Sequence, residues 1–577
     1  MSDARPDHLT WRHWVVTLLV LASLGAIMVR LYDLQIVNHE VYLDRAQATR
    51  HGNAETPAPR GVITDATGYP LAVSIDTWDI YIDRFLWRDH VKASEAAIAV
   101  ADFLHLDADM LFAEGISADI GDIPIRRDLS YQEGVALRAL DLWGIRTLPS
   151  AVREYPEGDL GSQIVGYVGI DGVGLWGVES DYDHLLRGQG GRVDRELDLL
   201  GRPIAFAANT DDRAVRGGEV QLTIDRFIQA IIERELERAL EEYDAPSGSI
   251  TVMRPRTGEI LGMASRPGAA ITAEGLQDPQ LSELVRNRPM TDLYEPGSVL
   301  KTLTTAMAID LGRVNAESTY VDEGSVLVGT DTISNWDFQA WGEVNVRTYL
   351  QKSLNTGSVW LSQLIGAEDF YKYLKNFGIG EQTHLGLSGE AEGLIRTPAD
   401  PAWYPVDLAT NSFGQGLAAS PLQVLTAVNT LANDGWLMRP YIVSRIVSAD
   451  DVRTFDPVAV RQVVSAETAH TMAGLMNDVV DGVEWHLAQV DGYAVAGKTG
   501  TTILSDESGY DFDTTIASFA GFLPYNDPQV SILIKIDTPQ GALNLGGQVA
   551  APVFSRVAAE IMEYLRIPPT EALVAAP

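Results

Sequence analysis

The sequence of 577 residues contains no cysteine, which excludes disulfides, zinc–thiolate sites and a catalytic thiol. Basic charge is also scarce: 43 lysines and arginines are outnumbered by 79 aspartates and glutamates, so the formal net charge is −36. Because binding to nucleic acid needs clustered basic residues, this composition argues against a nucleic-acid partner. Hydrophobic residues make up 46% of the chain, a composition typical of folded domains and not of disordered chains.

Nucleotide-binding motifs are missing as well. No GxGxxG follows a predicted strand, no GxxxxGK[ST] occurs, and the glycine-rich stretch 166–174 is typical of turns. We therefore predict no cofactor and no metal site.

Lysine itself is rare, since only seven of the 43 cations are lysines. Arginine cannot act as a base, whereas a lysine can once burial lowers its pKa. A lysine in such a chain is therefore a candidate for a role that needs an amine, although a general preference for arginine explains the pattern equally well. The seven are Lys92, Lys301, Lys352, Lys372, Lys375, Lys498 and Lys535.

One long apolar run lies near the N-terminus. Residues 14–29 carry no charge, and Arg12 and Arg30 flank them. With its neighbours the run reaches roughly the 20 residues that span a bilayer, so we predict a short tail over 1–12 and a transmembrane anchor over 13–32. A cleaved signal peptide is the alternative. The flanking charges leave the orientation open.

The rest of the chain divides near a polar, glycine-rich stretch at 205–218. We place one domain at 33–215, a second at 216–567 and a flexible tail at 568–577. Strands at both ends of the second domain with helices between them indicate an antiparallel sheet packed on helices, an α+β class. The predicted strands are 220–224, 248–253, 260–264, 493–502, 515–523 and 530–536; helices are predicted over 225–243, most of 291–432, and 550–565.

A serine and a lysine one helical turn apart form the first candidate for chemistry. A Pro-Gly turn precedes Ser298 and an apolar helix pattern follows it, so its hydroxyl should lie at a helix N-terminus, where backbone N–H groups favour negative charge. Lys301 shares that face and is the only charged residue from 298 to 309. Burial should lower its pKa, and a neutral amine can take the proton of a nucleophilic hydroxyl. A capping serine and a surface lysine would give the same pattern.

Two further motifs are weak when taken singly. Ser353 and Asn355 lie two apart in a predicted loop between helices, where a hydroxyl and an amide can point the same way. Lys498 lies on a predicted strand beside Gly500, whose missing side chain would let a bound chain approach the backbone, and the neighbouring threonines offer hydroxyls. An edge-strand lysine with a glycine bulge is the alternative for the last motif.

The three motifs gain specificity from their combination. Each occurs once, in this order, with 55 and 145 residues between their first members, which is the set found in penicillin-recognising serine enzymes. The chain as a whole resembles the class B penicillin-binding proteins, which are bacterial peptidoglycan D,D-transpeptidases. Further matching stretches are 59–61, 153–156, 166–169, 177–179, 222–225, 257–260, 414–416, 421–423 and 550–554. Chain length and the stretch 412–416 favour the division type over the elongation type.

The resemblance implies an architecture. It comprises one N-terminal transmembrane helix, an elongated mixed α/β pedestal of the dimerisation type over 33–215, and a transpeptidase domain over 216–567 with a five-stranded antiparallel sheet packed on helices. It also implies a cytoplasmic tail at 1–12 and a catalytic domain outside the cytoplasm, held at the bacterial cell membrane.

The resemblance also implies a role for each motif residue. Ser298 would be the acylated nucleophile that attacks the D-Ala-D-Ala end of a stem peptide, and Lys301 its base. Ser353 and Asn355 would relay protons and hold the substrate, and Lys498 would orient Lys301 and Ser353 by its charge. Thr499, Gly500 and Thr501 would bind the substrate carboxylate, and the backbone N–H groups of Ser298 and Thr501 would form the oxyanion hole.

The resemblance also implies partners: stem peptides with their nascent glycan strands, β-lactams, a SEDS-family glycan polymerase with other cell-wall machinery, and the lipid bilayer.

Two departures from the family pattern are Leu354 in the middle motif and Thr502 where alanine is common. The alternatives are a serine β-lactamase or D,D-carboxypeptidase, and an inactive membrane scaffold or sensor. The lactamase alternative lacks the deacylating Glu-x-x-Leu-Asn, since the look-alikes begin with Gln351 and Gln540.

Overall fold

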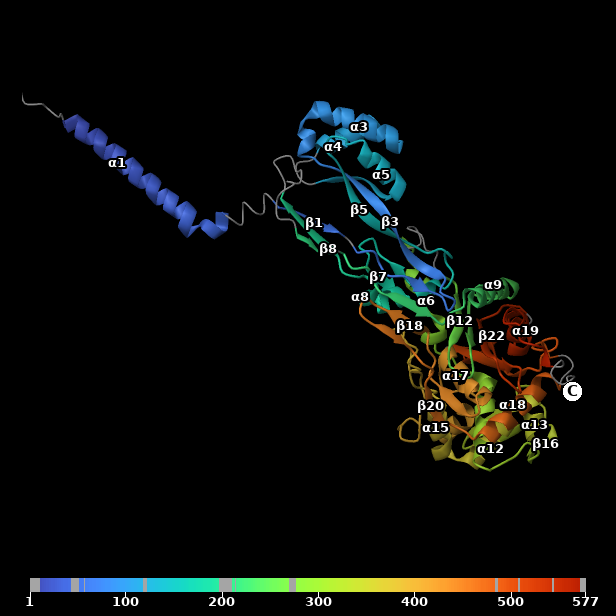
Figure 1. The fold of residues 1–577 in the computed structure, drawn as a ribbon. Helices are drawn as coiled ribbons and strands as arrows, with labels where there is room; N and C mark the ends of the chain where they lie inside the picture. Colours follow the sequence, from blue (N-terminus) through green and yellow to red (C-terminus); the bar gives the residue numbers. More distant parts are fainter. Residues whose placement is uncertain are drawn as a thin grey trace, which may run out of the picture. The chain divides into compact units, whose positions relative to one another are not determined.

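The computed structural model describes residues 11–42, 51–56, 58–117, 122–196, 210–212, 214–268, 277–482, 486–506, 509–541 and 544–570. Most of the tails predicted at 1–12 and 568–577, and part of the boundary stretch 205–218, lie outside these residues. The chain packs as two compact units (Figure 1). Unit 1 comprises 1–59, 75–152 and 189–216, and unit 2 comprises 60–74, 153–188 and 217–577. The last break lies next to the predicted boundary, but two segments of the predicted pedestal pack with unit 2, so the domain limits remain a prediction.

Unit 1 begins with the apolar helix α1 (Trp11–Tyr32), which continues into a short π-helix, η1 (Asp33–Val37). In the part of the chain that is described, this is the one helix long and apolar enough to cross a bilayer, and none of the side chains of α1 is buried. The helix contains the anchor predicted at 13–32.

The remainder of unit 1 has a small core of its own. Strand β3 (Pro70–Ile82) pairs over Thr77–Ile82 with β4 (Ile123–Ser130), and the buried Trp78 and Trp87 anchor this core. The other elements are β1 (His51–Thr56), η2 (Leu86–Arg88), α3 (His90–Leu104), α4 (Ala108–Ser117), α5 (Tyr131–Ala139), β5 (Ile145–Glu154), β8 (Gly191–Glu196) and β9 (Thr210–Asp212).

Unit 2 holds all three motifs. Its elements before the first motif are β2 (Ile63–Thr64), α6 (Ser162–Val165), β6 (Tyr167–Val168), β7 (Gly174–Trp176), α7 (Gly177–Asp181), α8 (Asp183–Leu186), β10 (Glu219–Leu222), α9 (Arg226–Glu242), β11 (Ser247–Met253), β12 (Ile260–Arg266), α10 (Leu281–Leu284) and α11 (Arg288–Thr291). Those from the first motif onward are the 3₁₀ turn η4 (Gly297–Val299), α12 (Leu300–Asp310), β13 (Thr319–Asp322), β14 (Ser325–Val328), β15 (Asp331–Ser334), β16 (Gly342–Asn345), α13 (Val346–Lys352), α14 (Asn355–Ile365), α15 (Ala367–Asn376), α16 (Pro405–Asn411), α17 (Pro421–Ala432), β17 (Trp436–Met438), β18 (Val443–Val447), β19 (Val452–Thr454), β20 (Ala459–Gln462), α18 (Ala466–Val480), β21 (Ala496–Asp506), β22 (Gly509–Leu523), β23 (Val530–Asp537) and α19 (Gly546–Tyr564).

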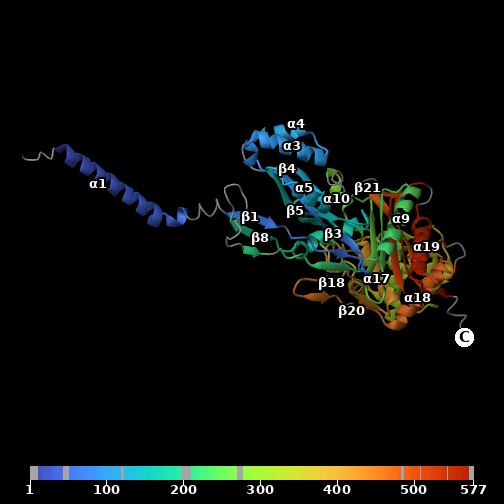
Figure 2. The same cartoon turned by 45° about the horizontal axis from the view of Figure 1, so that its top comes forward.

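The predicted five-stranded antiparallel sheet is confirmed, with strand order β12-β11-β23-β22-β21 and β21 at an edge. Alternate side chains enter two different cores, as the period of two requires. Ile250, Phe519 and Ile534 pack with α9 and α19, which lie side by side on one face (Figure 2). Ala520 and Leu533 share the other core with the helices α12, α17 and α18.

The prediction of helix across most of 291–432 was wrong for 377–404, which contain no helix, and for 319–345. Two small antiparallel hairpin pairs form there, β13 with β16 and β14 with β15. Gly324, Gly329 and Gly342, which lie between these strands or at their ends, have positive φ. Such glycines end helices and allow tight turns, so strands form instead.

Three of the stretches matched to the family join in one buried ion cluster. Arg60 donates to Glu179 at 2.6 Å and to Asp183 at 2.7 Å, and Arg153 donates to the other oxygen of Glu179 at 2.7 Å. Glu179 is fully buried, so the two arginines compensate its charge.

Candidate active site

Ser298 lies in η4, immediately before α12. Gly297 starts the turn with a left-handed φ of 56°, and the backbone is helical at Val299 (φ −60°) and Leu300 (φ −65°), so the turn runs directly into the helix. Ser298 and Lys301, three residues apart on this helical backbone, therefore project from the same face, as predicted. Ser298 is half-buried, which leaves its hydroxyl within reach of a ligand.

The amine of Lys301 is held by the second motif. Its Nζ donates to the Ser353 carbonyl oxygen at 2.6 Å and to Asn355 Oδ1 at 2.9 Å, and lies 3.3 Å from Ser353 Oγ. Lys301 has no exposed surface. Two members of one motif and the lysine of another thus meet at a single buried nitrogen.

Burial, and then the like charge of Lys498, hold the pKa of Lys301 well below its usual value of 10.5. This direction was predicted from the apolar helix and is confirmed. A neutral amine has two N–H bonds and one lone pair. The two short hydrogen bonds use both N–H bonds, which leaves the lone pair to accept a proton.

The middle motif occupies a loop between two helices, as predicted. Helix α13 ends at Lys352, Ser353 follows with the left-handed φ of 54°, and Asn355 begins α14. Asn355 also donates from Nδ2 to the Ser334 carbonyl at 2.9 Å, which fixes the amide so that its oxygen faces Lys301.

The third motif lies on β21, as predicted. Lys498 is 2% exposed, and its Nζ lies 3.3 Å from both the carbonyl and the hydroxyl oxygen of Thr499. Burial lowers the pKa of Lys498 to about 7. The third motif therefore supplies a second desolvated amine whose charge reaches Lys301.

Gly500 is needed for a reason that sequence analysis missed. A Cβ at this position would lie 2.4 Å from Ser518 Oγ, 2.7 Å from the Pro296 carbonyl and 3.0 Å from Val299. The glycine therefore lets β21 pack against the turn that carries Ser298.

The two threonines of the third motif lie toward the start of α19. Thr501 Oγ1 accepts from the Gly546 N–H at 3.0 Å, and a Cβ on Gly547 would contact Thr499. A Cβ on Gly297 would lie 2.9 Å from the Thr501 carbonyl, so the backbones of the first and third motifs are adjacent. The carboxylate site and the oxyanion hole remain predictions.

Sequence analysis noted Thr502 and the stretch 412–416 but assigned neither of them a contact in the site. Thr502 donates to the Glu295 carbonyl at 2.5 Å, while the Glu295 carboxylate accepts from the Gly416 N–H at 2.9 Å. Gly297 N–H donates to the Gly414 carbonyl at 3.0 Å. These bonds fix both sides of the turn before Ser298. The signal available in the sequence was a polar side chain at 502 where alanine is common.

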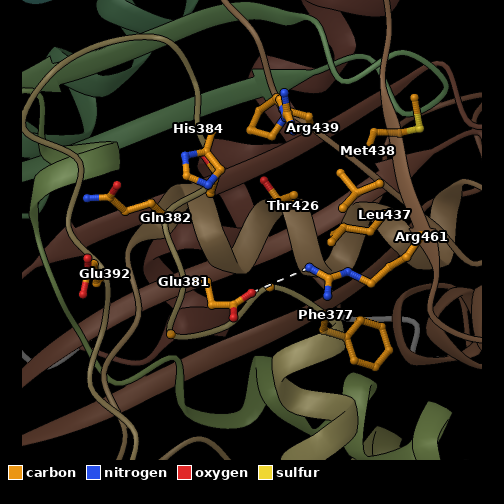
Figure 3. A pocket seen from close by; sticks show the side chains of 15 residues that line it. Phe377, Glu381, Gln382, His384, Glu392, Thr426, Leu437, Met438, Arg439 and Arg461 are labelled. Atoms are coloured by element: carbon orange, nitrogen blue, oxygen red, sulfur yellow. Dashed lines mark ion pairs between the residues drawn. The ribbon is translucent and has the colours of Figure 1, made fainter.

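A separate cavity of about 530 Å³ contains none of the predicted site residues (Figure 3). Phe377 and Leu437 line it together with Arg439, His384 and Arg461, which pairs with Glu381 at 3.6 Å. This cavity is therefore distinct from the cluster around Lys301.

Comparisons with known proteins agree with this geometry. Residues 248–562 match the penicillin binding protein transpeptidase domain, and residues 55–222 match the penicillin-binding protein dimerisation domain. Stage V sporulation protein D of Bacillus subtilis is 33% identical over 94% of this chain and 83% of its own length. Peptidoglycan D,D-transpeptidase FtsI of Escherichia coli is 29% identical over 98% of this chain and 94% of its own.

Solved structures show the same fold. Penicillin-binding protein 3 from Mycobacterium tuberculosis, in its complex with aztreonam, has a TM-score of 0.67 and 26% identity over 89% of this chain and 98% of its own. With the serine, the two buried lysines and the Ser-x-Asn loop placed in one matched domain, the chain belongs to the class B penicillin-binding protein family.

Proposed function

We propose that the chain is a serine-type peptidoglycan D,D-transpeptidase that cross-links stem peptides. The observation that carries this proposal is the desolvated Lys301 amine, held by Ser353 and Asn355 one helical turn from Ser298. A half-buried hydroxyl one helical turn from a neutral amine can be acylated without histidine or metal.

In the proposed first half-reaction, Ser298 Oγ attacks the carbonyl of the penultimate D-Ala while its proton passes to Lys301. The backbone N–H groups of Ser298 and Thr501 stabilise the oxyanion, by roughly 3–4 kcal/mol for each donor in comparable sites. The proton then reaches the departing D-Ala amine, with Ser353 within 3.3 Å of Lys301 as the relay. The product is an ester between Ser298 and the peptide.

In the second half-reaction an amine of a neighbouring stem peptide attacks the ester. Lys301 takes the amine proton and returns it to Ser298 Oγ as the new amide forms. Thr499 and Thr501 hold the substrate carboxylate, and the Lys498 charge keeps Lys301 neutral and ready to accept the proton. A β-lactam, as a mimic of D-Ala-D-Ala, stops at the acyl-enzyme.

Labelling with a fluorescent penicillin tests this proposal. Wild type should carry a stable label, Ser298→Ala should carry none, and wild type should join a donor peptide ending in D-Ala-D-Ala to an amine acceptor. Rapid release of the label would support a β-lactamase, release of D-Ala without cross-linking a carboxypeptidase, and absence of label an inactive scaffold or sensor.

We further propose that α1 anchors the chain in the bacterial cell membrane with the catalytic domain outside the cytoplasm, and that the enzyme acts at the division septum with a SEDS-family glycan polymerase. The relative named FtsI and the apolar helix at 11–37 support this proposal. A fluorescent fusion in growing cells should gather at the septum; an even distribution along the side wall would favour the elongation type.

A further inference from the structure

A short loop of unit 2, between β15 and β16, carries three solvent-exposed aromatic side chains. Trp336 is 60% exposed, Phe338 is 76% exposed and Trp341 is 38% exposed. Isolated exposed apolar residues are common, but here three large exposed rings occur within six residues, and groups of exposed apolar side chains mark binding sites. We call these three residues the aromatic platform.

The loop that carries the platform is rigid. Asn335 and Asp322 are each 1% exposed, and Asn335 Nδ2 donates to both Asp322 oxygens at 3.0 Å. The same carboxylate accepts from the Trp341 N–H at 2.9 Å, while Asn335 also donates to the Gln339 carbonyl at 3.1 Å. The rings are therefore presented by a loop whose backbone is fixed from beneath.

Phe338 adopts a φ of +57°. A bulky residue is an outlier in this region, where glycine or asparagine is more stable. Backbone strain of this kind concentrates at functional positions. The strain here turns a phenyl ring outward.

The platform borders the proposed active site through two direct bonds. Trp336 Nε1 donates to the carbonyl of Lys352, the residue before Ser353, at 3.0 Å. Asn355 donates to the carbonyl of Ser334, two residues before Trp336, at 2.9 Å. The Lys352 ammonium lies 3.9 Å from the Trp341 ring centroid and extends the platform toward the Ser353 loop.

We propose that the aromatic platform binds the acyl-donor peptide just upstream of its D-Ala-D-Ala end, with the rings covering a long aliphatic side chain. This inference rests on the proposed function and adds a specificity determinant to that site. An extended peptide advances about 3.3 Å per residue. The residues that precede the attacked bond are therefore the ones that can contact the platform, which lies next to the Ser353 loop. The sugar at the far end of a stem peptide lies several residues further away.

The test uses the full-length chain in detergent and compares two donor peptides. These are diacetyl-lysyl-D-Ala-D-Ala and acetyl-glycyl-D-Ala-D-Ala. Wild type should favour the lysyl donor by about tenfold in kcat/KM, which corresponds to partial burial of its methylenes. Trp336→Ala and Phe338→Ala should bring this ratio close to one. Trp336→Phe should retain most of it, because a ring remains while the indole N–H is lost. Trp436→Ala, which removes an exposed tryptophan on β17, is the matched control and should keep the wild-type ratio.

A ratio that survives in both alanine variants would overturn the proposal. So would a wild-type preference that appears only when a disaccharide is attached to the donor, since that result would assign the platform to the glycan strand. Penicillin labelling identifies variants whose site has folded. If neither variant is labelled, a donor with a diazirine on its long side chain is photo-cross-linked to wild type, and adducts outside 335–341 contradict the proposal. Absence of penicillin labelling in wild type would instead refute the proposed function.

Discussion

At the residue scale, Lys301 and Lys498 together determine which amine of the site is neutral. Each amine is buried, but only Lys301 has two short hydrogen bonds to oxygen acceptors. The charge of Lys498 lowers the pKa of Lys301, so in the proposed reaction Lys301 would accept a proton and Lys498 would keep Lys301 neutral.

Lys498→Met should shift the pH dependence of penicillin acylation. Lys301 must be neutral to act, so the rate rises as pH passes through its pKa. Removing the like charge raises that pKa and moves the rising limb to higher pH. The loss of rate should therefore be larger at pH 6 than at pH 9. Lys372→Met, at an exposed position on α15, is the control. An unshifted rising limb in Lys498→Met would contradict the electrostatic role.

At the scale of elements, the site depends on how closely β21 approaches the turn before α12. Gly500 and Gly297 permit this approach, and the Thr502 hydroxyl ties the strand to the Glu295 carbonyl. The strand and the helix carry different motifs, so their contact sets the distance between the two lysines and the serine.

Gly500→Ala should slow penicillin acylation by about 10–100-fold, because a Cβ there meets the Pro296 backbone at 2.7 Å and must displace β21 from the turn. Stopped-flow measurement with a fluorescent penicillin gives the rate. Gly474→Ala is the matched control, since nothing lies within 4 Å of its added Cβ on helix α18. An acylation rate equal to wild type in Gly500→Ala would show that the contact does not position the nucleophile.

Patterns of local sequence predicted the elements well. Asp225 caps α9 by accepting from Phe227 and Ile228 N–H, and each strand of the central sheet overlaps a predicted strand. The pairing of Lys301 with Ser353 and Asn355 could be expected only from the family resemblance, because contacts across 52 and 54 residues leave no local signal. The close contact at Gly500 and the hydrogen bond of Thr502 were missed for the same reason. Each depends on an element distant in sequence.

At the scale of the whole molecule, the burial of Lys301 and Lys498 reduces the stability of the fold. The unfolded chain keeps a proton on each lysine up to about pH 10.5, whereas folded Lys498 loses its proton at about pH 7. Between these values the unfolded state binds more protons, so the free energy of unfolding rises with pH. The site is thus maintained at the expense of stability in the neutral range.

Lys498→Met should therefore be more stable than wild type at pH 7. At about 1.4 kcal/mol for each unit of pKa difference between the folded and unfolded chains, the gain in the free energy of unfolding is a few kcal/mol. This gain should shrink as pH approaches 10. Urea unfolding of wild type and Lys498→Met from pH 7 to pH 10 measures the difference between their free energies of unfolding. Groups that titrate alike in both proteins cancel in this difference. Lys372→Met should show no such slope. A constant difference between wild type and Lys498→Met from pH 7 to pH 10 would refute a lowered pKa.

The position of β21 at the edge of the sheet has a consequence for which peptide bond is cut. An edge strand has one row of backbone groups without a neighbouring strand, and a peptide can bind along that row with a repeat of two residues. A slip of one residue would turn every substrate side chain to the opposite face and carry the wrong carbonyl toward Ser298. Regiochemistry would then follow from alignment along this edge, so that the serine needs no other means of distinguishing the penultimate bond from its neighbours.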